Sequence, residues 1–263
     1  MLMSKQPVST KKADQYNDPK HNYLDYWQGR DYEHLAEVMA IRRLLNGKHF
    51  KQAVDVGGGY GRLSKVLAEY ADDVTLTEPS SKQLDIAKDF LKSQPKIKRN
   101  LGQADSLDFK DDSVDLLIMI RVMHHLPDPG PELAEIARVL APKNGLAIIE
   151  VANYAHARNR VKYLLRGKKL PLQPVDIRSA ANKRNGEVAF VNHNPHTVMK
   201  QLDDAGLKVE RILSVSNLRS PSLKKLVPRQ VLLAVEGILQ PTLAKTFFGP
   251  SVFFLLSKKP RSK

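Results

Sequence analysis

Short apolar runs recur along the first 150 residues, and each is followed by glycine, proline or polar positions. Runs of this length that contain β-branched residues are typical of strands buried on both faces of a parallel sheet. On this basis the chain begins with a series of parallel strands. The predicted strands are 53–56, 73–77, 97–101, 116–120 and 145–151.

The stretches between these runs repeat their apolar positions every three or four residues, which is the pattern of a helix with one buried face. Such helices are predicted at 22–45, 62–68, 81–90, 132–140 and 197–205, with another around 230–239. Strands that alternate with helices favour an α/β fold with a doubly wound, mostly parallel sheet. Strands predicted at 207–215 and 251–256 complete the sheet.

A glycine-rich turn follows the first strand, where Gly57, Gly58, Gly59 and Gly61 come directly after Val56. Glycines allow positive φ angles and let a ligand approach the backbone, and the helix behind them presents unpaired N–H groups. The dinucleotide fingerprint would need a glycine at position 62, which is Arg62, and no Lys-Ser or Lys-Thr pair of a P-loop follows. The turn therefore predicts a nucleotide-like ligand other than a dinucleotide or a P-loop triphosphate.

A carboxylate follows the second strand at Glu78, which lies 23 residues after Asp55. An acidic residue at the carboxyl end of this strand can accept hydrogen bonds from both hydroxyls of a ribose. Position and chemistry together predict that Glu78 binds the sugar of the ligand.

The chain resembles the class I S-adenosylmethionine (SAM)-dependent methyltransferases over residues 50–215 and the last strand. The resemblance is carried by the spacing from Asp55 to Gly61, by Glu78 and Asp105, and by the loop that begins at Arg121. The resemblance implies a Rossmann-like, seven-stranded sheet that ends in an antiparallel hairpin, and SAM as cofactor. In that family the glycine turn holds the methionine part of SAM, and carboxylates bind the ribose and the adenine. The implied cofactor-binding residues are Asp55, Gly57, Gly58, Gly59, Gly61, Glu78, Pro79, Ala104, Asp105 and Arg121.

The loop after the fourth strand reads RVMHHLPDP from Arg121 and resembles a subgroup of this family that acts on small molecules. Ligands in parallel sheets lie outside the carboxyl ends of the strands, so this loop should face the methyl group. His124 or His125 is a predicted general base, because the ordinary pKa of histidine is close to neutrality. The alternative is that either ring caps the next helix or orders the loop.

Around the main domain, 48–263, the sequence predicts a flexible N-terminal tail at 1–21, a helical cap at 22–47, and insertions at about 153–195 and 217–250. The cap begins with aromatic residues, of which Tyr26, Trp27 and Tyr32 are predicted to line the substrate mouth. The alternative is that these rings pack the cap onto the edge of the sheet.

Positive charge is concentrated in the C-terminal part of the chain. Of the net charge of +14, residues 1–150 contribute −1 and residues 151–263 contribute +15. Such asymmetry indicates an acidic partner, and the basic stretch 154–185 could contact RNA or an anionic membrane surface. The alternative is a face that only keeps the protein in solution.

Other classes of function find little support. The chain has no cysteine, which is compatible with a reducing cytoplasm, and His193 and His196 lack the neighbouring ligands of a metal site. The start of the chain has no apolar segment of the signal-peptide type, and no apolar run is long enough to span a membrane. The sequence thus predicts methyl transfer to an oxygen, nitrogen or carbon of a small or lipid-like, anionic acceptor; the alternatives are an RNA methyltransferase and a SAM-binding protein without activity.

Overall fold

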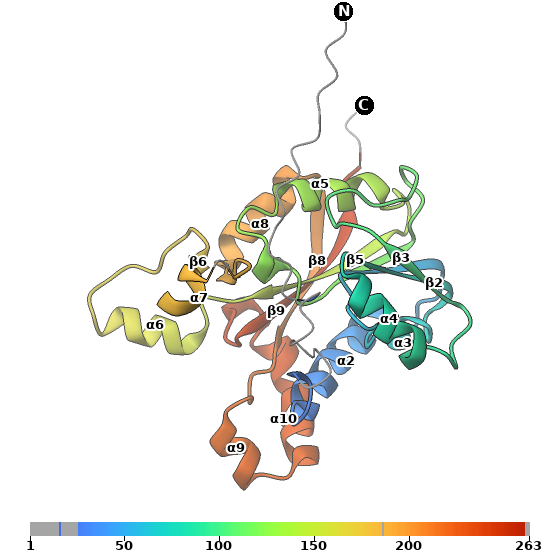
Figure 1. The fold of residues 1–263 in the computed structure, drawn as a ribbon. Coiled ribbons are helices and arrows are strands. Elements are labelled where there is room, and N and C mark those ends of the chain that lie inside the picture. Colours follow the sequence, from blue (N-terminus) through green and yellow to red (C-terminus); the bar gives the residue numbers. More distant parts are fainter. Residues whose placement is uncertain (1–15, 17–25, 186, 261–263) are drawn as a thin grey trace, which may run out of the picture.

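The computed structural model describes residues 16, 26–185 and 187–260, which form a twisted central sheet between two layers of helices (Figure 1). Within the described residues this sheet has seven strands in the order β3-β2-β1-β4-β5-β9-β8. Its strands are β1 (Phe50–Val56), β2 (Ala71–Glu78), β3 (Ile97–Leu101), β4 (Leu116–Met119), β5 (Leu146–Ala152), β8 (Leu207–Val215) and β9 (Ser251–Lys258). The predicted fold class is confirmed.

Strand direction follows from the pairing. β1, β2, β3, β4 and β5 are parallel to one another, whereas β9 runs antiparallel to both β5 and β8. The chain order reverses between β1 and β4, and ligands of open α/β sheets bind at the carboxyl ends of the strands at such a point. The site is therefore expected where Val56 and Met119 end their strands.

Helices cover both faces of the sheet, as Figure 1 shows. The helices that pack on one face are α2 (Asp31–Leu45), α3 (Ser64–Leu67) and α4 (Ser81–Phe90), and those on the other are α5 (Gly130–Val139) and α8 (Pro195–Asp204). Each layer buries apolar side chains against the strands, such as Ile41 of α2 on one face and Ile136 of α5 on the other. Burial on both faces explains why the strands read as continuous apolar runs.

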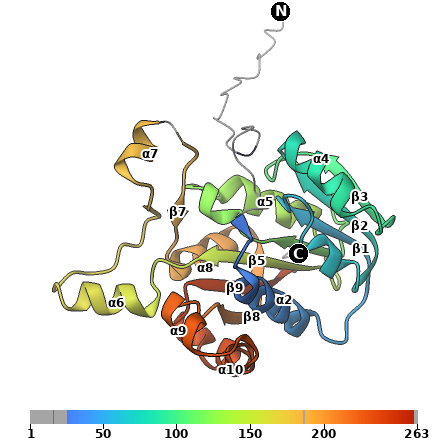
Figure 2. The ribbon, with the colours of Figure 1, turned by 60° about the horizontal axis from the view of Figure 1, so that its bottom comes forward.

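Two long segments leave the carboxyl edge of the sheet. The segment between β5 and α8 contains α6 (Ala157–Leu164), β6 (Val175–Asp176), α7 (Ala180–Arg184) and β7 (Val191–Asn192). The segment between β8 and β9 contains α9 (Pro221–Leu226), α10 (Arg229–Thr242) and the short 3-10 helix η2 (Ala244–Thr246). In Figure 2, α6 lies outside the main body of the sheet and its helices, and in Figure 1, α9 lies below the sheet near α10.

Two predicted helices are shorter than expected. The cap helix was predicted from residue 22, but α2 starts at Asp31, because Gly29 has a φ of +70° that no helix continues through. Residues 22–25 and most of the predicted tail at 1–21 lie outside the described residues. The helix behind the glycine turn was predicted at 62–68, but α3 has only four residues.

None of the described helices is long and apolar enough to cross a membrane.

Candidate functional site

The glycine turn connects β1 to α3 at the carboxyl edge of the sheet. Gly57 and Gly59 have φ angles of +65° and +60°, and the N–H of Gly57 donates to the carbonyl of Thr77 at the end of β2 (2.7 Å). A Cβ on Gly57 would lie only 2.5 Å from a methyl carbon of Val122 in the loop after β4. The turn therefore needs glycine both for its backbone angles and for the close approach of the β4 loop.

Asp55 lies beneath the turn rather than on its surface. Its side chain is buried, and Oδ2 accepts a hydrogen bond from Oγ of Ser64 (2.7 Å). Burial raises the pKa of Asp55 to about 6, against the opposing effects of Ser64 and Arg62. A small cavity of about 20 Å³, enough for roughly one water molecule, lies between Asp55, the turn and Arg121.

Glu78 joins the end of β2 to the glycine turn. One carboxylate oxygen accepts the N–H of Gly59 (2.9 Å) and the other accepts the N–H of Ser80 (3.0 Å). These two bonds fix the orientation of the carboxylate against the turn. The structure thus places Glu78 in contact with the turn, as the prediction of a shared ligand requires.

The remaining predicted cofactor residues follow β2 and β3. Pro79 precedes Ser80, whose hydroxyl caps α4 by accepting the N–H of Gln83 (3.2 Å). Asp105 is exposed, and Ala104 beside it is half-buried, in the turn after β3. The N–H of Gly102 donates to the carbonyl of Glu78 (3.2 Å), which brings this turn next to the end of β2.

Arg121 begins the loop after β4 with a φ of +61°, a left-handed conformation that is uncommon for a residue with a side chain. Its N–H donates to Oε2 of the buried Glu150 (3.1 Å), and its guanidinium binds Glu37 of α2 through Nε (2.7 Å). Arg62, from the glycine turn, binds the other oxygen of Glu37 (2.6 Å). Burial alone would raise the pKa of Glu37, but the two arginines outweigh it and hold that pKa below its usual range.

Trp27 contacts both of these arginines. The guanidinium carbon of Arg62 is 3.6 Å from the centre of the Trp27 ring and that of Arg121 is 4.8 Å away, so both make cation–π contacts. The indole Nε1 is buried and has no hydrogen-bond partner in the described structure, which leaves a donor for a ligand at the cap. Tyr26 packs edge-on against Trp27, with its hydroxyl 3.5 Å from Nη1 of Arg121. The structure thus brings both aromatic residues to the Arg62–Arg121 pair.

Tyr32, the third predicted substrate residue, lies in a buried polar network instead. Its hydroxyl donates to Oε2 of Glu236 in α10 (2.7 Å) and accepts the N–H of Leu218 (3.1 Å). Glu236 also accepts the N–H groups of Ser216 and Asn217 (2.8 and 2.9 Å). Tyr32 therefore connects the cap to the loop after β8.

His124 and His125 lie in a short 3-10 helix, η1 (Met123–His125), after β4. Their rings are 4.1 Å apart, and Phe190 covers both. Burial lowers the pKa of His125. The pKa of His124 is lowered well below 6.5, first by burial and then by the nearby His125 and Arg121. Both shifts lie below the ordinary value from which the sequence argument started, and both favour the neutral ring.

The hydrogen bonds of His125 determine its tautomer. Nδ1 lies 3.1 Å from the carbonyl of Ala189, which can only accept, so Nδ1 carries the proton. Nε2 is then an acceptor, and the Tyr16 hydroxyl donates a hydrogen bond to it (2.7 Å). His124 has ring contacts but no hydrogen bond to the part of the chain that the structure describes.

Tyr16 was placed in the flexible tail by the sequence, but it crosses the candidate site. Besides its bond to His125, its carbonyl accepts from Oγ of Ser80 (3.3 Å), so one residue connects the loops after β2 and β4. The polar sequence around Tyr16 gave no signal of this contact.

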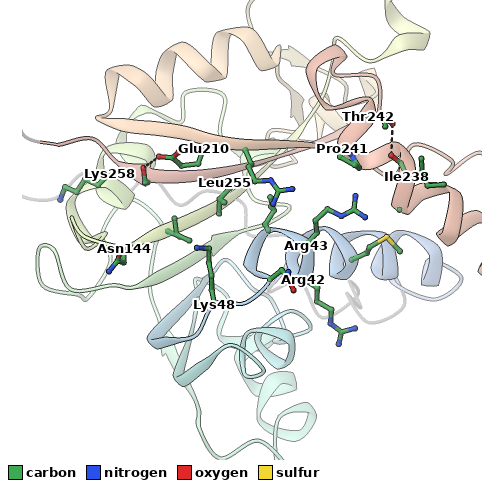
Figure 3. A pocket seen from close by; sticks show the side chains of 18 of the residues that line it. Arg42, Arg43, Lys48, Asn144, Glu210, Ile238, Pro241, Thr242, Leu255 and Lys258 are labelled. Carbon is green, nitrogen blue, oxygen red and sulfur yellow. Dashed lines mark hydrogen bonds between the residues drawn. The ribbon is translucent and has the colours of Figure 1, made fainter.

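A separate groove of about 1360 Å³ lies at the opposite edge of the sheet (Figure 3). Its walls are the ends of α2 and α10, and its floor includes Leu146 at the start of β5 and Leu255 of β9. Arg43, Lys48 and Arg211 line it and have no ion-pair partner among the described residues. The glycine turn and Glu78 are not part of this groove.

The residues at the carboxyl edge fit SAM. The turn offers a surface free of side chains, Glu78 offers acceptors for the ribose hydroxyls, and the exposed Asp105 offers an acceptor for an amino group. No group of three histidine, aspartate or glutamate side chains in the described residues is arranged to hold a metal ion.

Comparison with known proteins agrees with this arrangement. The model of a methyltransferase domain family matches residues 54–149. An uncharacterized methyltransferase of Mycobacterium tuberculosis is 31% identical over 99 residues, which cover 38% of this chain and 39% of that protein. An O-methyltransferase of Aspergillus nomiae is 30% identical over 170 residues, which cover 57% of this chain and 75% of that protein.

The chain spans about two-fifths of the length of the first curated relatives it matches. A solved SAM-dependent methyltransferase of Thermotoga maritima superimposes with a TM-score of 0.62 at 20% identity, covering 90% of this chain and 94% of the other. This likeness shows that the two proteins share the fold.

Proposed function

Because the chain belongs to the class I SAM-dependent methyltransferases, we propose that it transfers a methyl group from SAM to an oxygen, nitrogen or carbon atom of a small acceptor. The observation that supports this most directly is the bond between the Gly59 N–H and Glu78 (2.9 Å), which joins the turn to the carboxylate at one edge of the sheet. A plain structural turn would not need both a glycine with positive φ and a buried carboxylate that accepts the N–H of that glycine.

The protein's task in this reaction is mainly orientation. SAM, when bound, supplies a methyl group on a positively charged sulfur that is already an activated leaving group. Glu78 and Asp105 would hold the nucleoside part, while Gly57, Gly58, Gly59 and Gly61 would accommodate the methionine part. Holding donor and acceptor in line can lower the activation free energy by roughly 7–11 kcal/mol.

His125 is the better of the two candidate general bases, on geometry. Its Nδ1–H is fixed by the Ala189 carbonyl, which leaves Nε2 as the basic nitrogen, and its lowered pKa keeps it unprotonated at pH 7. The base would accept a proton at Nε2 from an oxygen or nitrogen acceptor once Tyr16 releases that nitrogen. His124 would line the same space.

The acceptor is a small or lipid-like molecule with negative charge. The sequence from Arg121 to Asp128 resembles the subgroup that acts on small molecules, and the A. nomiae relative is named an O-methyltransferase. Arg121 and Arg219 are within electrostatic range of each other, and both carry positive charge near Tyr26. An anionic acceptor would offset this charge, with Tyr26 and Trp27 beside it.

The second candidate function is methylation of RNA, which the basic stretch 154–185 favours. A third is SAM binding without catalysis. Incubating the protein and labelled-methyl SAM with fractionated cell extract separates the three. Label in an organic-soluble or small polar fraction supports the proposal, label in RNA supports the second function, and tight SAM binding with no labelled product supports the third.

A further inference from the structure

Two projecting segments expose large apolar side chains. In the α6 arm, residues 157–172, Leu164 and Leu165 are 79% and 82% exposed. In the α9 arm, residues 218–229, Leu226 is 81% exposed. Single exposed leucines are ordinary on protein surfaces, but adjacent ones on a projecting segment indicate a contact surface.

The exposed residues of the α6 arm follow helical spacing. Val161, Leu164 and Leu165 are at positions i, i+3 and i+4 and so share one face of α6. A surface helix normally turns such a stripe toward the core, yet none of the eight residues of α6 is buried. A helix this short is marginal in water without a surface to pack on. The stripe thus lacks its packing partner in the isolated chain.

Positive charge surrounds the exposed leucines. The α6 arm contains no acidic residue, and its six basic residues are Arg158, Arg160, Lys162, Arg166, Lys168 and Lys169. Arg160 binds backbone carbonyls of the protein, including that of Phe247 (2.9 Å), whereas Lys168 and Lys169 are exposed and make no ion pair with the described residues. The α9 arm also lacks acidic residues, but Lys224 and Arg229 pair with Glu33 and Asp31 of α2 (2.8 and 2.9 Å), which leaves Arg219 and Lys225 as its basic residues without an ion pair to the described residues.

Both arms leave the same edge of the sheet as the candidate site. The α6 arm follows β5, and the α9 arm follows β8, which runs in the same direction as β5 because each is antiparallel to β9. The glycine turn follows β1, which is parallel to β5 through β4. A surface that contacts either arm therefore lies on the side of the molecule where the acceptor must enter.

We propose that the two arms dock the protein on an anionic lipid surface, with the leucines entering the headgroup region and the basic residues facing anionic headgroups. Basic residues with apolar side chains on a short exposed helix are typical of helices that lie in the membrane interface. An RNA backbone would use the positive charges but gives no reason for exposed Leu164, Leu165 and Leu226. This proposal rests on the proposed function in one respect: docking on the lipid surface would bring a lipid-like acceptor to the methyltransferase site.

The test is co-sedimentation of the full chain with vesicles of phosphatidylcholine alone or mixed with phosphatidylglycerol. We expect binding to the anionic vesicles only, weakened by added salt. Leu164→Glu/Leu165→Glu should lower the partition coefficient at least tenfold, and Lys168→Gln/Lys169→Gln should lower it by about fivefold for each charge removed. Leu226→Glu tests the α9 arm independently.

The matched control is Arg43→Gln/Lys48→Gln, which removes two positive charges from the groove at the opposite edge of the sheet (Figure 3). It should bind vesicles as the unmodified protein does. Equal losses in the control and in the lysine variant of the arm would overturn docking through the arms. Absence of vesicle binding by the unmodified protein would also overturn the proposal. So would vesicle binding that is unchanged by the leucine substitutions, together with an affinity for total RNA that depends on the arm lysines.

Calorimetry with SAM separates this proposal from the proposed function. All of these variants leave the glycine turn and Glu78 intact, so each should bind SAM with unchanged affinity, which also shows that it is folded. Loss of vesicle binding with normal SAM affinity supports docking by the arms. If the unmodified protein binds vesicles but does not bind SAM, the proposed function is contradicted and the docking proposal is still supported.

Discussion

Glu37 and Arg121 form a buried ion pair, with Oε1 of Glu37 2.6 Å from Nη2 of Arg121. The side chain of Glu37 is only 2% exposed, and its other oxygen binds Arg62 (2.6 Å). One carboxylate of the cap helix thus binds an arginine from the glycine turn and another from the loop after β4. This pair of contacts sets the position of the cap over the candidate site.

Replacing Glu37 with Gln should strongly destabilise the protein. The substitution keeps the shape but leaves the positive charges of Arg62 and Arg121 without their buried partner, which typically costs roughly 3–5 kcal/mol. Urea unfolding at pH 7 measures this loss. Because the folded-state pKa of Glu37 is lowered, its contribution is present above the unfolded pKa and is lost as the pH falls through the folded pKa, so the two proteins should converge in acid.

The control for this prediction is Glu69→Gln, which breaks the exposed pair between Arg42 and Glu69 (2.8 Å). Exposed pairs contribute at most about 1 kcal/mol, so this variant should unfold almost as the parent protein does. Similar losses for the two variants would contradict the view that burial makes the Glu37 cluster important.

Asp55→Asn should stabilise the protein in a way that depends on pH. The pKa of Asp55 is about 6 in the folded state against 3.8 ordinarily, so the unfolded chain ionises first and burial of the charge costs stability as the pH rises from about 4 to 6. The asparagine variant has no such cost and can still accept from Ser64. Its advantage should be near zero at pH 4 and reach roughly 3 kcal/mol at pH 7.

Thermal or urea unfolding of both proteins across this pH range measures the difference. Asp73→Asn is the control, because Asp73 is exposed and paired with Lys98 (3.1 Å), and its effect should stay below about 1 kcal/mol at every pH. An advantage of Asp55→Asn that does not change with pH would contradict the assignment of a buried charge.

Gly59→Arg should abolish SAM binding in calorimetry. Gly59 has a φ of +60° and donates its N–H to Glu78, so a side chain there strains the turn and occupies the surface that the cofactor would use. Gly47→Arg is matched in backbone strain, since Gly47 has a φ of +71°, but a Cβ there meets nothing within 4 Å. Unchanged affinity in the Gly59 variant, or equal loss in both variants, would refute the cofactor site.

The sheet could be predicted from the sequence because its strands are buried on both faces. Continuous apolar runs located β1, β2, β4 and β5 within about three residues of their ends. The same reasoning missed the two-residue strands β6 and β7, whose short pairing of Val175 with Asn192 leaves no periodic pattern. The start of α2 was missed because the aromatic run continues the helical spacing through Gly29.

The helical spacing of α2 contains a signal of the Glu37 cluster. Glu33, Glu37, Ile41 and Leu44 are spaced by four, four and three residues and so stand on the same buried face of α2. A carboxylate at an inner position needs a cationic partner. Arg62, at the position where a dinucleotide site would have glycine, is that partner. By contrast, Tyr16 reaches its contacts through tertiary structure alone.

The final prediction concerns His125 and Tyr16. If His125 is the general base, methyl transfer to an oxygen or nitrogen acceptor should fall as the pH drops through a pKa below 6.5, because burial disfavours the charged ring. The Tyr16 hydroxyl donates to Nε2 and so stabilises the neutral ring. Tyr16→Phe should therefore move the acid limb of the pH profile to higher pH, and His125→Asn should remove that limb with a loss of roughly 10²–10⁴-fold in rate.

NMR titration of the histidines measures the pKa of His125 directly, and labelled-methyl transfer at each pH gives the profile. His196→Asn is the matched control, because the His196 ring packs against Phe247, away from the His124–His125 pair, and its loss should leave the acid limb unchanged. A purely structural His125 would lower the rate equally at all pH values and leave the limb in place in the Tyr16 variant. Only a base whose neutral form Tyr16 stabilises moves the limb in the predicted direction.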